Sequence, residues 1–188
     1  MRQTIKELRE IFISDSESFI NEINKLYSLS ENELNWKATS ETWSIAECID
    51  HLAVTNKLYF NEMEKQFAEK QIICIDSKEY VKHKFLGKLI IKTVDPSNVK
   101  KTKTFNVFKP GKSLYDKNVI DKLINTQKDL INLISVSFNI NFNKYVMSSP
   151  ASKLIKENFS DVLEIVRLHN KRHLLQIDGI IKGKDFHA

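Results

Sequence analysis

The sequence contains few residues that interrupt helices, and few cysteines. Its 188 residues include four Gly and three Pro, a scarcity that disfavours short strands with tight turns and favours long helices. Two cysteines, Cys48 and Cys74, are too few for a disulfide framework. Cys48 lies on the apolar face of a predicted helix, where we expect a small core residue, with a redox role as the alternative.

Long apolar stretches are also missing. No run approaches the roughly 20 residues that span a bilayer, so the sequence predicts no membrane partner. The first ten residues alternate charged and apolar side chains and lack the apolar core of a signal peptide. We therefore expect a cytoplasmic protein. The length predicts one domain, residues 1–188, with a single substantial core.

Four segments carry apolar residues at helical spacing, namely residues 4–28, 43–70, 118–135 and 158–182. Helices that each have one apolar stripe must pack on one another, and the simplest solution is an all-α four-helix bundle. The connection between the second and third helices, residues 71–113, is long for a bundle. It would allow these two helices to run parallel through a crossover, with short helical pieces around residues 80–91.

The last predicted helix contains two histidines, His169 and His173, four residues apart within its apolar stripe. At about 100° per residue they project from one face, one turn apart. Two imidazoles in this arrangement can bind one divalent ion. Taken as an isolated pair, they also fit core histidines whose hydrogen bonds are satisfied by neighbours.

A third histidine, His51, lies in the second predicted helix. Thr42 or Ser40 would cap the start of this helix, and Glu47 falls in its early turns, where acidic residues are favoured. His51 projects from the flank of the apolar face rather than from its centre. This position suits the rim of a pocket between helices, and it also suits an ordinary boundary histidine.

Two motifs in these helices carry a family resemblance. The first is Trp43-Ser-Ile-Ala-Glu-Cys-Ile-Asp-His51-Leu, and the second is Leu168-His-Asn-Lys-Arg-His-Leu-Leu-Gln-Ile177. Together with Leu34-Asn-Trp36 and Phe108-Lys-Pro110 they cover most of the chain. The sequence resembles the DinB-like superfamily, which consists of bacterial four-helix proteins, many of which carry a divalent metal on three histidines.

The resemblance implies a DinB-like bundle whose metal ligands are His51, His169 and His173. Zinc or nickel is the expected ion. Three nitrogen ligands with an open position are typical of catalytic sites of the zinc type. The sequence departs from the family before the last helix, where relatives often have His-Pro and this chain has Ser149-Pro150. Any role of that additional histidine is absent here.

The predicted crossover is strongly basic. It contains ten lysines against three acidic residues, a local balance of +7 in a chain whose total is +5. This excess describes either a solvated loop or an electropositive rim that draws an anionic small-molecule substrate toward the metal. Phe85, Phe105 and Phe108 lie among the lysines and could stack bases, but no nucleic-acid-binding motif accompanies them. We therefore expect no nucleic-acid partner, and we expect these rings to anchor the crossover to the bundle.

The family suggests the chemistry. DinB-like relatives include thiol-dependent transferases that use low-molecular-weight thiols such as bacillithiol. The resemblance therefore implies a metal-dependent S-transferase of the bacillithiol-transferase type, with such a thiol as cofactor. A metal-dependent hydrolase and a non-catalytic metal- or ligand-binding module are the alternatives. A homodimer is left open.

No residue stands out as a general acid or base, so the sequence leaves the catalytic side chains unidentified. Glu47 and Glu62 lie toward the His51 side of their helix, where exposed glutamates are common. Gln176 projects near His169 and could orient a ligand or serve core hydrogen bonding. His83 and His187 are expected to face solvent, so neither is a candidate fourth ligand.

Overall fold

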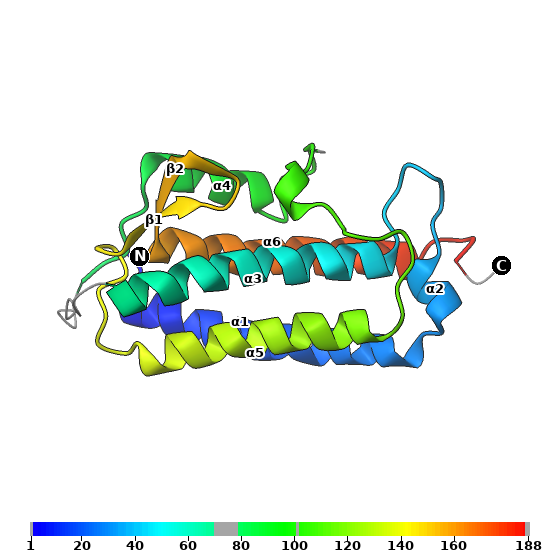
Figure 1. The fold of residues 1–188 in the computed structure, drawn as a ribbon, viewed down its shortest axis with the longest axis horizontal. Helices are drawn as coiled ribbons and strands as arrows, with labels where there is room; N and C mark the ends of the chain where they lie inside the picture. Colours follow the sequence, from blue (N-terminus) through cyan, green and yellow to red (C-terminus); the bar gives the residue numbers. More distant parts are fainter. Residues whose placement is uncertain (1, 70–78, 101, 187–188) are drawn as a thin grey trace.

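The structure is a computed structural model that describes residues 2–69, 79–100 and 102–186. Some predictions concern residues outside these ranges, namely Cys74, His187 and the lysines at 70, 78 and 101. The chain is mostly helical, as predicted. Four long helices lie side by side (Figure 1): α1 (Ile5–Lys25), α3 (Ile45–Glu69), α5 (Asn118–Val136) and α6 (Phe159–Ile181).

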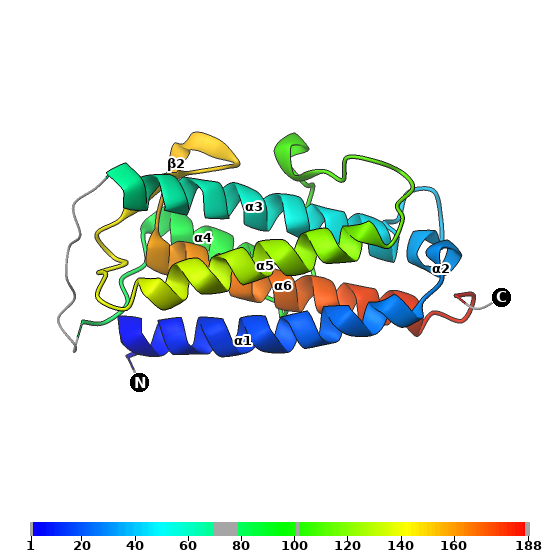
Figure 2. The same ribbon diagram turned by 60° about the horizontal axis from the view of Figure 1, so that its bottom comes forward.

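Each long helix packs on two of the others. Helix α1 contacts α5 and α6, and α3 contacts the same two helices, an arrangement that both views show (Figures 1 and 2). Helices α3 and α5 run in the same direction (Figure 1). The shorter elements are η1 (Leu26–Ser28), α2 (Glu31–Asn35), α4 (Phe85–Val94) and η2 (Asn106–Phe108). None of the described helices is long and apolar enough to cross a membrane.

The predicted all-α fold is confirmed in part, because a small two-stranded sheet accompanies the helices. Strands β1 (Val146–Ser149) and β2 (Ser152–Asn158) form an antiparallel hairpin directly before α6. Tyr145, Met147 and Ser149 are buried at alternating positions, which is the period of a strand with one face inward. Because the alternation covers so few residues, the sequence pattern did not distinguish it from a loop.

Capping residues set the starts of the long helices. Thr4 and Glu7 form a capping box at α1, and Asn158 and Asp161 form one at α6. At α3 the cap is Ser44, whose hydroxyl accepts from the Glu47 N–H at 3.1 Å while its own N–H donates to the Glu47 carboxylate at 2.8 Å. The predicted caps Thr42 and Ser40 are wrong, and Thr42 instead closes a local turn with Thr39.

A polar layer crosses the middle of the four helices and separates two apolar clusters. Asn56 of α3 donates to Gln127 of α5 at 3.0 Å and to Asn170 of α6 at 3.1 Å. Gln127 in turn donates to Ser16 of α1 at 2.7 Å. Because buried amides must find partners, this layer fixes the axial register of all four helices.

Candidate metal centre

Three histidines meet between α3 and α6. His51 comes from α3, and His169 and His173 come from adjacent turns of α6. Their ligand nitrogens all lie within 4.8 Å of one another. Nε2 of His169 lies 3.1 Å from Nε2 of His51 and 3.0 Å from Nε2 of His173. The structure therefore brings together the three side chains that the sequence singled out, and their role as ligands stays a prediction.

The geometry of the cluster fits a divalent ion. Nitrogens bound at about 2.0–2.1 Å to one ion are roughly 3–3.4 Å apart in common coordination geometries. The two separations from His169 Nε2 fall in this range, and the ligand nitrogens of His51 and His173 lie within 4.8 Å of each other. His51 Nδ1 lies 2.6 Å from the carbonyl oxygen of Phe108. A carbonyl only accepts, so Nδ1 carries the proton and the Nε2 lone pair faces the other two rings. The cluster could therefore hold a divalent metal ion.

The surroundings keep the imidazoles neutral. Burial lowers the pKa of His51, although the hydrogen bond to Phe108 opposes the shift. Desolvation and the neighbouring histidines lower the pKa of His169 well below its usual value. Burial lowers the pKa of His173 to about 3. All three are therefore in the unprotonated form that binds metal ions at neutral pH.

Trp43 covers the cluster from the segment before α3. Its ring centroid lies 4.9 Å from that of His51 and 6.2 Å from that of His173, with an interplanar angle of 18° to the latter. The indole thus packs against two of the three histidine rings. In the sequence, Trp43 is noted only as the first residue of a motif. Its contact with His173 could not be predicted, because it depends on how the segment before α3 packs on α6.

Several other predicted site residues have different roles. Glu47 is buried where its carboxylate accepts from the N–H of the cap residue Ser44, and it also pairs with Lys37 at 3.0 Å, so it is occupied structurally. Burial raises the pKa of Cys48 to about 12, in keeping with a small core residue rather than a thiolate. Gln176 is exposed and interacts with His173 rather than with His169. Glu62 is half-buried.

The prediction that His83 faces solvent is wrong. Its Nδ1 lies 2.9 Å from the carboxylate of Asp161, whose side chain is fully buried at the start of α6. This carboxylate also accepts the backbone N–H of Lys84 at 3.2 Å. A buried carboxylate needs donors, and His83 supplies one. His83, two residues before α4, is therefore a structural contact to the start of α6.

Among residues 2–69, 79–100 and 102–186, no fourth His, Cys, Asp or Glu joins the cluster.

Arg172 of α6 holds the end of the α4 segment in place by donating to the carbonyls of Asp95 at 3.2 Å, Lys100 at 3.0 Å and Asn98. The basic segment thus packs on the helix that bears two of the histidines.

The predicted anchoring of the crossover by its phenylalanines is wrong for two of the three. Phe85 is 76% exposed and Phe105 is 57% exposed. Only Phe108 is half-buried, and its carbonyl is the one that contacts His51. The polar contacts of Arg172 hold residues 95–100 instead, and such contacts leave no periodic signal in a sequence.

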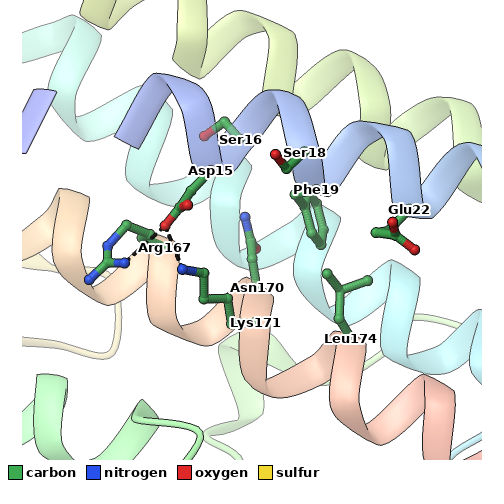
Figure 3. A pocket seen from close by; sticks show the side chains of 9 residues that line it. All are labelled: Asp15, Ser16, Ser18, Phe19, Glu22, Arg167, Asn170, Lys171 and Leu174. Atoms are coloured by element: carbon green, nitrogen blue, oxygen red, sulfur yellow. Dashed lines mark hydrogen bonds and ion pairs between the residues drawn. The ribbon is translucent and has the colours of Figure 1, made fainter. Parts of the chain in front are cut away.

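A separate pocket of about 100 Å³ lies between α1 and α6 (Figure 3). The Asp15 carboxylate lies beside it and pairs with Arg167 at 2.9 Å and with Lys171 at 2.6 Å. Asn170 and Ser16 of the polar layer also line it. None of the three histidines does, so this pocket is distinct from the candidate metal centre.

The comparisons with known proteins agree with the geometry. A family model described as the DinB superfamily matches residues 21–177. This range contains α3, almost all of α6 and all three histidines of the cluster. No curated protein and no solved structure matches the chain.

Proposed function

Since the chain belongs to the DinB superfamily, we propose that it is a metal-dependent S-transferase of the bacillithiol-transferase type. In this proposal His51, His169 and His173 hold zinc or nickel, and a low-molecular-weight thiol is the cofactor. The four long helices would form the family's bundle, with residues 71–113 as its crossover. A cytoplasmic location, a single domain and the absence of nucleic-acid and membrane partners stay predictions.

One observation carries the proposal: three Nε2 atoms converge, and no fourth protein ligand joins them in the described part of the chain. Structural metal sites are usually closed by four protein ligands, whereas catalytic sites keep a position open. An ion at such a site supplies Lewis acidity, which lowers the pKa of a thiol or of water. The three histidines are neutral and pre-positioned for this role.

The proposed reaction needs little from other side chains. The thiol sulfur forms a bond to an electrophilic carbon of the substrate, the leaving group departs with the electron pair of its bond, and the thiol proton passes to solvent. A reaction without a protein base suits this site, because the Glu47 carboxylate is already bound to Lys37 and to the Ser44 N–H. The lysines of the crossover, such as Lys92 and Lys100, would attract an anionic thiol or substrate.

The test combines metal analysis with turnover. Purified protein should contain about one divalent ion per chain after loading with zinc or nickel, as expected for three ligands with an open position, and it should transfer carboxylated thiols to small electrophiles. The His173→Ala variant should lose both the metal and the transfer. His83→Ala, which removes a histidine outside the cluster, should keep both. If the two variants match the wild type on every thiol, the transferase proposal fails. Metal-dependent hydrolysis without thiol transfer, or stoichiometric metal without any turnover, would also overturn it.

A further inference from the structure

Asp50, the residue before His51, holds a loop against α3. Its side chain is buried and accepts three hydrogen bonds. The Gly111 N–H and the Tyr115 hydroxyl each donate to one carboxylate oxygen at 2.9 Å, and Lys122 Nζ donates to the other at 2.7 Å. Gly111 and Tyr115 belong to residues 106–115, which we call the strap.

The strap is also the part of the chain that contacts His51. The carbonyl of Phe108, three residues before Gly111, accepts from His51 Nδ1 at 2.6 Å. Two consecutive residues of α3 thus bind the strap at positions three residues apart. The Asp50 carboxylate accepts from Gly111, and the His51 imidazole donates to Phe108. Neither contact is local, because Phe108 follows His51 by 57 residues and Gly111 follows Asp50 by 61.

We propose that Asp50 is a positioning residue of the metal centre, acting through the strap. By fixing Gly111 it places the Phe108 carbonyl where it orients the His51 ring and keeps the proton on Nδ1. The Nε2 lone pair then faces His169 and His173. This inference rests on the proposed metal site, and it concerns the affinity and geometry of that site rather than its reaction.

A second anchor makes the inference testable in a folded protein. Asn35 of α2 exchanges two hydrogen bonds with the backbone of Tyr115, at 2.7 and 2.9 Å. Loss of the Asp50 carboxylate therefore releases the part of the strap near Phe108 while the far end stays attached. Partners of a ligand histidine outside the coordination sphere typically change metal affinity by about 10–100-fold when removed.

The experiment is a titration with Co²⁺, followed by its visible absorption, on the full chain. Asp50→Ala should weaken Co²⁺ binding by about 10-fold or more and alter the absorption bands. Asp50→Asn keeps an acceptor for Gly111 and Tyr115 and should restore binding to within a few-fold of the wild type. Tyr115→Phe, which removes a single strap contact, should show a smaller loss.

Asp15→Ala is the matched control, because it also removes a carboxylate that pairs with cations but does not contact the strap. It should lower the melting temperature without changing Co²⁺ affinity or absorption. If Asp50→Ala binds Co²⁺ like Asp15→Ala, the carboxylate is only structural and the inference is overturned. A wild type that binds no Co²⁺ overturns the metal site as well. Loss of Co²⁺ affinity in Asp50→Ala without thiol transfer in the wild type would overturn only the proposed reaction.

Discussion

Glu157 of β2 is a carboxyl group in an environment that suits its neutral form. It is fully buried, and the Tyr59 hydroxyl lies 3.4 Å from one of its oxygens. The other oxygen has no hydrogen-bond partner among the described residues. Burial raises the pKa of Glu157 to about 7, with Asp161 adding to the shift and Ser149 and Tyr59 opposing it. The folded protein therefore holds this proton more tightly than the unfolded chain does.

This difference predicts a pH-dependent stability. The contribution of Glu157 is complete below its ordinary pKa of 4.5 and is lost as the pH rises through the folded value of about 7. Glu157→Gln cannot ionise, so its stability relative to the wild type should rise between pH 4.5 and about pH 8, by at most roughly 3 kcal/mol. Urea unfolding at both pH values measures this change. The exposed Glu17→Gln should show none, and a Glu157→Gln variant that follows the wild type at both pH values would contradict the prediction.

Among the contacts between helices, Gly87 allows α4 to lie directly on the start of α6. A Cβ at this position would lie 2.3 Å from Cγ of Asp161, whereas one at Gly179 of α6 would meet nothing within 4 Å. Gly87→Ala should therefore destabilise the fold by roughly 1–3 kcal/mol. Gly179→Ala should stabilise it by about 0.5–1 kcal/mol, because it restricts the unfolded chain without a clash. Thermal unfolding of the pair measures both effects. If both variants gain stability, the close packing of α4 on Asp161 is wrong.

The helices whose apolar pattern repeats over several turns could be predicted from the sequence. The helix start and the strands that depend on only a few residues could not. The four long helices each show several turns of one apolar stripe, which is a strong signal. The start of α3 was misplaced because Ser40, Thr42 and Ser44 are all good capping residues. Only Ser44 has a glutamate three residues later, the signature of a capping box. In strand β2, residues 153 and 154 are both exposed, so buried and exposed residues do not alternate in the way that would predict a strand.

The candidate site combines a local sequence pattern with contacts between distant parts of the chain. The spacing of His169 and His173 alone predicted that the two rings would meet. Joining them to His51 requires the packing of α3 on α6, which the apolar stripes of the helices and the family resemblance together predict. The contacts that orient His51 come from the strap, more than fifty residues away in sequence. No periodicity encodes such contacts, because a single carbonyl or carboxylate makes each of them.

The same arrangement predicts that metal binding stabilises the whole fold. An ion held by residues of α3 and α6 binds only when these helices are packed, so it adds RT ln(1 + [M]/Kd), or about 2.7 kcal/mol at 100 times Kd. Zinc should therefore raise the melting temperature of the wild type in proportion to the logarithm of its concentration. His169→Ala removes the ring whose Nε2 lies within 3.1 Å of Nε2 of both other histidines and should abolish the shift. His83→Ala loses its contact with Asp161, so it should melt at a lower temperature yet respond to zinc as the wild type does. An equal zinc response in His169→Ala would place any bound ion elsewhere on the chain.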